Sequence, residues 1–260
     1  MAVDAVGMMR TLSAITAFVL MTGLATSCVA SANSPCRAER VDGVDYTICG
    51  FDPADDIRLF RADAAGEVYG DFDNLESDLA AQGETLRFAM NAGMYHADRA
   101  PVGLFIEDGV DVSPLVTSKG PGNFHMLPNG VLVLSRSEDK GPLRDAYVIE
   151  SGAYEVAAHD VWSATQSGPM LVIDGALHPK FLASGTSRKI RNGVGVGRDG
   201  LVYFVKSETP VNFHGFARLF RDHLGADDAL YLDGTVSRVF IAGERNDAGV
   251  PMGPMVGVVE

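Results

Sequence analysis

The sequence is poor in cysteine, tryptophan and basic residues. It contains 3 Cys and 1 Trp in 260 residues, and its 34 Asp and Glu outnumber its 21 Lys and Arg, which gives a formal net charge of -13. This acidic balance argues against general nucleic-acid binding, because that binding uses clustered cations to displace counterions. The spacings H-x-H, H-E-x-x-H and C-x-x-C are also absent from the sequence, so a structural zinc site is not expected.

The sequence has one long apolar run, at residues 12–26. This run is short for a membrane span and is followed by an A-x-A pattern that ends at Ala32, which is typical of a cleaved secretory signal peptide. We therefore predict a signal peptide at residues 1–32 and a single domain at residues 33–260, without a transmembrane segment and located in the periplasm or outside the cell. Cys28 leaves an alternative, in which the protein is anchored as a lipoprotein through this cysteine.

Two cysteines follow the predicted signal peptide. Cys36 and Cys49 flank an alternating segment with Asp42-Gly43 at its middle, and a hairpin there would bring the two sulfur atoms together. Two free buried thiols are the other interpretation, but an oxidising compartment favours a disulfide. A disulfide that closes a loop of this size stabilises a fold by about 3 kcal/mol.

The chain is punctuated by Asp-Gly and Asn-Gly pairs between apolar, β-branched runs. Such pairs tolerate positive φ at both central turn positions, so each predicts a β-hairpin; they are Asp42-Gly43, Asp108-Gly109, Asn129-Gly130, Asp174-Gly175, Asp199-Gly200 and Asp233-Gly234. Helical patterns are few and lie at 71–83 and 211–225, with a third, short one near 159–165. The sequence therefore predicts an α+β fold, with a curved, mainly antiparallel β-sheet built of hairpins and packed against a few helices.

A glycine-rich stretch, RNGVGVGRDGLVYF at residues 191–204, contains the pattern G-x-G-x-x-G. A dinucleotide site requires a helix after these glycines, whereas the apolar, β-branched residues that follow predict a strand. The glycines instead allow another backbone or a ligand to approach closely. Arg188, Lys189 and Arg191 precede them. These cations belong either to an ordinary solvated loop or to a phosphate site, since a guanidinium can hold a phosphate with two parallel hydrogen bonds.

Two other stretches carry candidate residues whose role has two interpretations. In MNAGMY, Asn91 and Gly93 form either an ordinary turn or a hydrogen-bonding edge for a ligand. In GPGNFHMLPNG, Asn123 and His125 lie on either side of Phe124, and His125 is either a structural residue or a proton carrier near neutral pH.

A third stretch, ATQSGP, carries Gln166 and Ser167. Gln166 either contacts a sugar hydroxyl or satisfies the backbone of a loop. Ser167 is not the nucleophile of a serine hydrolase, because Thr165 stands where that motif needs glycine.

Two polar residues come at the ends of predicted elements. His214 lies in the first turn of the helix predicted at 211–225, after Asn212 as its N-cap. Asp233 ends the apolar run ALYLD. It belongs either to one more hairpin turn or to a carboxylate presented at the end of a rigid strand, where it can act as base, acid or nucleophile.

These stretches, in this order, resemble the phosphodiester glycosidase family, and in particular a bacterial exported branch linked to exopolysaccharide biosynthesis. The matching pieces, which cover about residues 40–242, are MNAGMY, APVGLFIEDG, GPGNFHMLPNGV, ATQSGPMLVIDGALHP, RNGVGV, PVNFHGFARLF and ALYLDGTVS. The resemblance implies site residues at the positions that match the family's motifs: Asn91, Gly93, Gly168, Arg191, Asp233 and Gly234. Thr235 and Val236 stand where the lysosomal branch has two glycines, so the substrate of that branch is not implied.

The resemblance implies an exported hydrolase that acts on a phosphorylated saccharide in envelope or exopolysaccharide metabolism. It would cleave the bond between the anomeric carbon of a sugar and a phosphodiester. In this hypothesis Arg191, helped by Arg188 or Lys189, holds the phosphate. Asp233 is the general base or nucleophile, and His125 or His214 donates a proton. The other substrate-binding candidates are Asn91, Gly93, Asn123, Gln166, Ser167, Gly168, Asn192 and Gly234.

No cofactor is required by this hypothesis, although the resemblance also allows a divalent cation with Asp233 as a ligand. The alternative function is a non-catalytic protein that binds envelope glycans or phosphorylated polymers.

Overall fold

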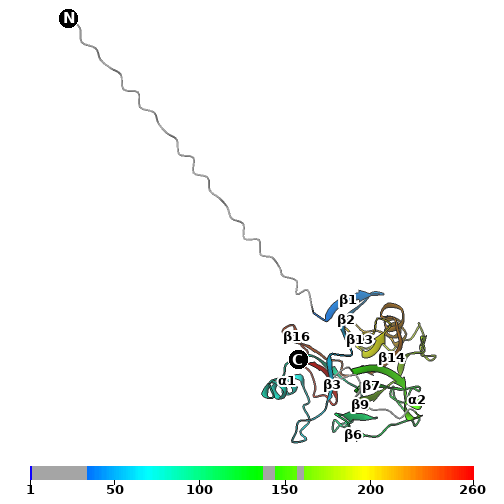
Figure 1. The fold of residues 1–260 in the computed structure, drawn as a ribbon. Coiled ribbons are helices and arrows are strands. Elements are labelled where there is room, and N and C mark those ends of the chain that lie inside the picture. The colour runs from blue at the N-terminus through cyan, green and yellow to red at the C-terminus, as the bar shows by residue number, and fades with distance from the viewer. Residues whose placement is uncertain (2–33, 137–143, 157–160) are drawn as a thin grey trace. The chain divides into compact units, whose positions relative to one another are not determined.

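Three β-sheets make up most of the fold (Figure 1). The computed structural model describes residues 1, 34–136, 144–156 and 161–260. Residues 35–260 form one compact unit, whereas the predicted signal peptide, with Cys28, lies outside the described residues apart from Met1. In the described part of the chain, no helix is both long and apolar enough to cross a membrane.

Every pairing between the described strands is antiparallel. The first sheet has the order β1 (Cys36–Val41), β2 (Val44–Phe51), β13 (Val202–Ser207), β12 (Asn192–Gly197), β14 (Ala226–Asp233), β10 (Met170–Ile173) and β11 (Ala176–Leu177). The second has the order β16 (Arg245–Asn246), β15 (Val239–Ile241), β4 (Leu86–Asn91), β17 (Met255–Val259) and β3 (Asp56–Phe60). The third has the order β6 (Val110–Ser113), β5 (Phe105–Glu107), β9 (Val161–Ser167), β7 (Gly130–Arg136) and β8 (Arg144–Glu150). The predicted α+β class is confirmed, with the strands divided among three sheets.

Four of the six predicted turns join hairpin strands: β1 to β2, β5 to β6, β10 to β11 and β12 to β13. Asp42, Asp108 and Asp174 have positive φ, as do the glycines that follow them, which is the combination that type I′ turns require. The other two predictions are wrong. Asn129 directly precedes β7, and Asp233 ends β14, from which the chain passes to the second sheet at β15.

The helices are α1 (Phe72–Ala81), α2 (Ser151–Val156), α3 (Phe213–Arg218) and the π-helical turn η2 (Leu219–His223) that continues α3. The two main helix predictions are confirmed. The side chain of Asp71 caps α1 by accepting the N–H of Asn74, and that of Asn212 caps α3 by accepting the N–H of Gly215. The short helix expected near 159–165 is wrong, because residues 161–167 form β9, whose backbone pairs with β5 and β7 on its two sides.

The three sheets share one hydrophobic core, to which Phe51 of β2, Phe88 of β4 and Leu132 of β7 contribute. A second cluster joins the other face of the first sheet to α3 and η2, and a third joins the second sheet to α1. Each long helix therefore covers the face of a sheet that points away from the common core.

The glycines of β12 make room for a helix. A Cβ atom built on Gly193 would lie 2.7 Å from the carbonyl oxygen of Leu230 and 3.2 Å from the ring of Phe216, and one on Gly195 would lie 2.9 Å from the ring of Phe220. Phe216 and Phe220 belong to α3 and η2. The strand predicted after the G-x-G-x-x-G pattern is present as β13. The glycines allow the close approach of another backbone, at Leu230, as predicted, and also of aromatic side chains.

The predicted disulfide is confirmed. Cys36 and Cys49 are paired directly opposite each other in the β1–β2 hairpin, and their sulfur atoms are bonded. The disulfide closes the hairpin at the end distant from the Asp42-Gly43 turn.

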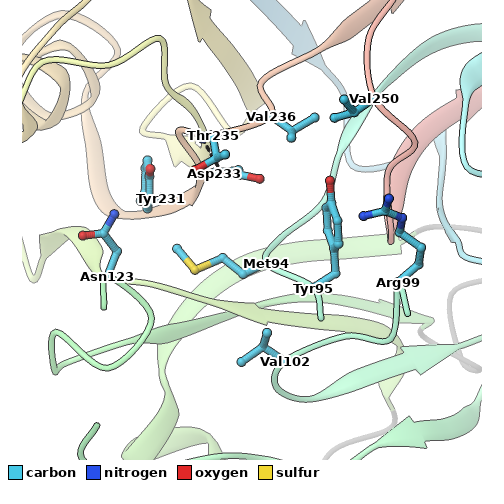
Figure 2. A pocket seen from close by; sticks show the side chains of 10 residues that line it. All are labelled: Met94, Tyr95, Arg99, Val102, Asn123, Tyr231, Asp233, Thr235, Val236 and Val250. Atoms are coloured by element: carbon cyan, nitrogen blue, oxygen red, sulfur yellow. Dashed lines mark hydrogen bonds between the residues drawn. The ribbon is translucent and has the colours of Figure 1, made fainter. Parts of the chain in front are cut away.

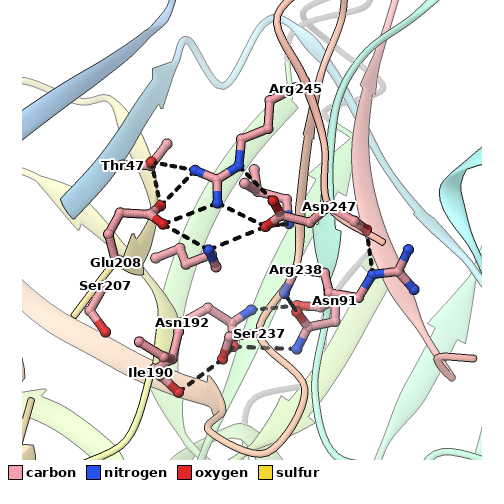
Figure 3. A network of polar contacts seen from close by, with 12 residues as sticks. Thr47, Asn91, Ile190, Asn192, Ser207, Glu208, Ser237, Arg238, Arg245 and Asp247 are labelled. Carbon is pink, nitrogen blue, oxygen red and sulfur yellow. Dashed lines mark hydrogen bonds and ion pairs between the residues drawn. The ribbon is translucent and has the colours of Figure 1, made fainter. Parts of the chain in front are cut away.

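A network of charged side chains joins the first sheet to the second (Figure 3). Glu208, just after β13, accepts hydrogen bonds from Arg245 at 2.7 and 3.0 Å and from Thr47 at 2.7 Å. The ammonium group of Lys206 lies 3.0 Å from Glu208 and 3.2 Å from Asp247. Two cations and two carboxylates therefore compensate one another at the junction of the sheets.

Candidate active site

A pocket of about 440 Å³ lies beside the end of β14 (Figure 2). Two segments, 94–102 and 231–236, supply most of its wall. The lining residues are Met94, Tyr95, Arg99, Val102, Asn123, Tyr231, Asp233, Thr235, Val236 and Val250. The pocket therefore combines apolar side chains with a carboxylate, a guanidinium, two phenols and an amide.

Asp233 is the carboxylate of this pocket. It is the last residue of β14 and only 8% exposed. Its Oδ1 atom accepts the backbone N–H groups of Gly234 at 2.5 Å and Thr235 at 2.7 Å, and Figure 2 shows a carboxylate oxygen directed towards Tyr95. Burial raises the pKa of Asp233, and the hydrogen bonds from the backbone N–H groups oppose that rise. A buried carboxylate with a raised pKa is a typical candidate for acid–base catalysis.

Tyr95 and Arg99 form the opposite side of the pocket. Tyr95 packs tightly on the backbone of Gly253, where an added Cβ atom would lie 2.6 Å from the Tyr95 side chain. Burial raises the pKa of Tyr95, and the negative charge of Asp233 raises it further. Arg99 sits in a turn with φ of 70°, and its guanidinium carbon lies 5.4 Å from the centre of the Tyr95 ring. One cavity therefore holds a cation and a carboxylate.

Arg191 does not line this pocket. It is fully buried, with its Nε atom donating to the carbonyl oxygen of Val211 at 2.9 Å and its Nη2 atom donating to that of Ser187 at 3.0 Å. Its guanidinium carbon lies 3.7 Å from the centre of the Phe213 ring. Tyr231, which lines the pocket, interacts electrostatically with Arg191. The predicted arginine is therefore a neighbour of the pocket wall.

Asn91 and Asn192 join the first sheet to the second (Figure 3). Asn192 Nδ2 donates to the backbone oxygen of Asn91 at 2.9 Å, and Asn91 Nδ2 donates to Asn192 Oδ1 at 3.3 Å. Asn91 Oδ1 also accepts the backbone N–H of Arg238 at 3.0 Å. Gly93 has φ of 151° and lies against the third sheet, where a Cβ atom would be 3.3 Å from the hydroxyl of Thr165. These predicted binding residues make contacts inside the protein.

Gln166 satisfies the backbone of a loop, which is one of its two predicted roles. Its Oε1 atom accepts the N–H groups of Leu104 at 3.0 Å and Val116 at 2.9 Å, and its Nε2 atom donates to the carbonyl oxygen of Val116. Ser167 is also fully buried, and its hydroxyl donates to a backbone carbonyl at 3.0 Å. Gly168 has no room for a side chain, because a Cβ atom would lie 2.6 Å from the Cβ of Asn129.

The two candidate histidines lie outside the pocket. His125 Nδ1 is 2.8 Å from the carbonyl oxygen of Ser118. His214 lines a separate pocket of about 140 Å³ that is mainly apolar. Arg188 is exposed and lines none of these cavities. Gly234 lines a neighbouring cavity of about 600 Å³.

Of the predicted catalytic and binding residues, the pocket brings together Asp233 and Asn123. It adds three polar residues that the sequence analysis missed, Tyr95, Arg99 and Tyr231. Side chains alternate between the two faces of a strand, so Tyr231, two residues before Asp233, lies on the same face as Asp233. This alternation could have identified Tyr231 from the sequence. Tyr95 and Arg99 lie directly after the MNAG motif, but only the fold of their loop brings them to Asp233.

Within the residues that the structure describes, no three side chains of His, Cys, Asp or Glu gather in a group that could hold a metal ion. Asp233 as a ligand of a divalent cation stays a prediction.

Comparison with known proteins relates this chain to a family. The family model described as phosphodiester glycosidase matches residues 84–258. The uncharacterized protein YigE of Escherichia coli (strain K12) is 33% identical over 187 residues, which cover 72% of this chain and 70% of that protein.

Two solved structures share the fold. The zebrafish N-acetylglucosamine-1-phosphodiester alpha-N-acetylglucosaminidase catalytic domain, auto-inhibited by its pro-peptide, matches with a TM-score of 0.56 and 13% identity, over 86% of this chain and 81% of that one. A hypothetical protein from Synechocystis matches with a TM-score of 0.57 and 14% identity, over 86% and 61% of the two chains.

Proposed function

The chain belongs to the phosphodiester glycosidase family, and from this premise we propose that it is an exported hydrolase of sugar-1-phosphodiesters in envelope or exopolysaccharide metabolism. The observation that carries the proposal is one pocket of about 440 Å³ lined by the carboxylate of Asp233 and the guanidinium of Arg99. This volume is in the range of small-molecule sites. The Cys36–Cys49 disulfide supports export, because disulfides persist in oxidising compartments.

Asp233 acts as the general base in this proposal. Its carboxylate removes a proton from a water molecule, whose oxygen attacks the anomeric carbon of the sugar. The bond between that carbon and the phosphate oxygen breaks, and the phosphate monoester leaves with the bonding electron pair. Ordinary glycosidases use a second carboxyl group to protonate the leaving group. A phosphate needs no such proton, so one carboxylate suffices.

Arg99 takes the role of phosphate ligand in this proposal, in place of Arg191. Arg191 is fully buried, whereas Arg99 is partly exposed and lines the pocket with Asp233. A guanidinium stabilises both the bound phosphodiester and the additional negative charge that develops on the leaving phosphate. His125 and His214 are given no role, because neither lines the pocket.

The test is a panel of sugar-1-phosphodiesters offered to the purified protein, with sugar phosphomonoesters and plain glycosides as controls. We expect hydrolysis of one or more phosphodiesters, lowered at least about 100-fold in kcat/KM by Asp233→Asn and about tenfold or more by Arg99→Met. Arg40→Met is the matched control, because Arg40 is a surface residue of β1 paired with Asp45. Hydrolysis of plain glycosides alone would refute the role of the phosphate. Tight binding of phosphorylated saccharides without turnover would instead support the non-catalytic alternative.

A further inference from the structure

Arg191 is a buried cation with an unused hydrogen-bond donor. Its Nε and Nη2 atoms donate to backbone carbonyl oxygens, but among the described residues Nη1 has no partner in hydrogen-bonding geometry. No ion pair joins Arg191 to a described carboxylate. Burying a guanidinium without a counterion is costly.

The unused donor lies near the hydroxyl group of Tyr231. A Cβ atom built on Gly234 would lie 3.5 Å from Arg191 Nη1 and still closer to the Tyr231 hydroxyl oxygen, so both atoms border the same small space. Arg191 and Tyr231 interact electrostatically. Tyr231 is 1% exposed, and its ring is held edge-on against Phe213 at 4.8 Å between ring centres. The hydroxyl group is therefore fixed in place.

A second N–H group lies near the same hydroxyl group. The side chain of Asn123 lowers the pKa of Tyr231, and Figure 2 shows the Asn123 amide nitrogen on the side of the phenol. With the amide of Asn123 and the guanidinium of Arg191 beside it, the phenolic oxygen is surrounded by N–H groups, which can donate to it but cannot accept its proton, so that proton is available to another acceptor. Tyr231 and Asn123 both line the pocket, and the cavity is where a ligand can supply that acceptor.

The two ends of the pocket differ in charge. Figure 2 shows Tyr231 and Asn123 on one side of Asp233, and Tyr95 and Arg99 on the other. The Arg99 end presents a cation and suits an anion. The Tyr231 end presents a neutral O–H donor strengthened by the charge of Arg191 behind it, which suits a neutral hydroxyl or amide oxygen of a sugar.

From these observations we propose that Tyr231 binds the sugar of the substrate, that Arg191 is a positioning residue acting through Tyr231, and that the phosphate lies at the Arg99 end, with the anomeric carbon at Asp233 between them. This assignment of the two ends rests on the proposed function. It gives the fully buried Arg191 a part in substrate recognition without direct contact. Burial keeps the phenol protonated by raising its pKa above the ordinary value, although the positive charge of Arg191 opposes that rise.

Binding measurements test the orientation separately from turnover. One probe is a set of free monosaccharides that includes N-acetylglucosamine, measured by ligand-observed NMR, and the other is glycerol 3-phosphate, measured by calorimetry. We expect Tyr231→Phe to weaken binding of the best monosaccharide about tenfold and to leave glycerol phosphate unchanged. Arg99→Met should weaken glycerol phosphate by a similar factor and leave the monosaccharide unchanged. The opposite pattern, equal losses for both probes, or a wild-type protein that binds no monosaccharide would overturn the proposal.

The positioning role of Arg191 is tested in two backgrounds. Arg191→Lys should weaken monosaccharide binding when Tyr231 is present and should have no further effect in Tyr231→Phe, because its influence passes through the phenol. Equal losses in both backgrounds would show that Arg191 does not act through Tyr231. If Arg191→Lys does not fold in a thermal melt, the Tyr231→Phe and Arg99→Met measurements still decide the orientation. Binding is measured without catalysis. Absence of hydrolysis would therefore refute the proposed function, but the binding data would still test the orientation of the substrate.

Discussion

Gly234 allows the most direct perturbation of the pocket wall, because it touches the Tyr231 hydroxyl group through its backbone alone. The Cβ atom of an alanine at this position would lie closer to the Tyr231 oxygen than real Cβ atoms come to any neighbour, and 3.5 Å from Arg191 Nη1. A comfortable contact needs about 3.5 Å, so one of the two groups must move by about 1 Å.

The moving group should be the loop rather than the tyrosine. Tyr231 is buried and packed edge-on against Phe213, whereas Gly234 directly follows Asp233 at the end of β14. A shift of about 1 Å in a reacting group can lower a rate about 100-fold, which corresponds to about 2.7 kcal/mol. Overpacking of this kind lowers stability by about 1–3 kcal/mol, so the variant should remain folded while its activity falls.

The assay is kcat/KM for the best sugar-1-phosphodiester, accompanied by a thermal melt and monosaccharide binding. Gly152→Ala is the matched control. Gly152 is exposed in α2, and an added Cβ atom there would meet nothing nearer than a Glu150 carboxylate oxygen at 3.6 Å. In the Tyr231→Phe background most of the clash is relieved, because the next atom, Tyr231 Cζ, lies 3.3 Å away. In that background, Gly234→Ala should lower kcat/KM only slightly below the value for Tyr231→Phe alone.

Two results would contradict this reasoning. One is a Gly234→Ala variant with wild-type kcat/KM and wild-type sugar binding, which would mean that the Tyr231 hydroxyl group and the loop of Asp233 have no role in the site. The other is strict additivity of Gly234→Ala and Tyr231→Phe, which would mean that the two changes do not act on the same contact.

Three further predictions concern protonation and packing. A general base must be ionised, and burial raises the pKa of Asp233. The profile of kcat/KM against pH should therefore rise with a midpoint above the ordinary aspartate pKa of about 3.9. A midpoint at the ordinary value would argue against Asp233 as the base. Burial alone would raise the pKa of Glu208, but hydrogen bonds, led by that of Arg245, lower it to about 2 from 4.5. The stabilisation is therefore complete above pH 4.5 and is lost as the pH falls towards 2. The urea midpoint should fall more between pH 5 and pH 3 for the wild type than for Glu208→Gln, and equal falls would exclude this contribution. Gly195→Ala should lower the free energy of unfolding by about 1–3 kcal/mol, because its added methyl group presses on Phe220. An unchanged melting temperature would show that η2 can shift without loss of stability.

The local parts of the fold could be predicted because short-range chemistry determines them. Asp42-Gly43 has the backbone freedom of a type I′ turn, and this turn places Cys36 opposite Cys49. Asp71 and Asn212 are side chains that cap helices, and helices begin directly after both. These features depend on a few neighbouring residues.

The site could be predicted only in part, because contacts distant in sequence build it. Asp233 can be predicted from its place at the end of an apolar strand, where the sheet holds the backbone that carries the carboxylate. Arg191 had the right chemistry for a phosphate, but its burial depends on Phe213 and on backbone carbonyl groups from another segment. Arg99 reaches the pocket because its loop packs against Gly253, which is distant in the sequence. No local pattern contains that information.

The same limit applies to the amides. Asn91 and Gln166 have side chains that could equally bind a ligand or satisfy the protein's own backbone. Their partners Asn192 and Val116 lie 101 and 50 residues away along the chain. The choice between the two roles is therefore made by the arrangement of the three sheets.

The bond that is broken tests the central claim most directly. Hydrolysis of a sugar-1-phosphodiester in water enriched with ¹⁸O marks the atom that water attacks, and mass spectrometry of the phosphate monoester reads the outcome. If Asp233 directs water to the anomeric carbon, the phosphate product carries no ¹⁸O and the label is in the sugar. Label in the phosphate product would show attack at phosphorus and would contradict the account.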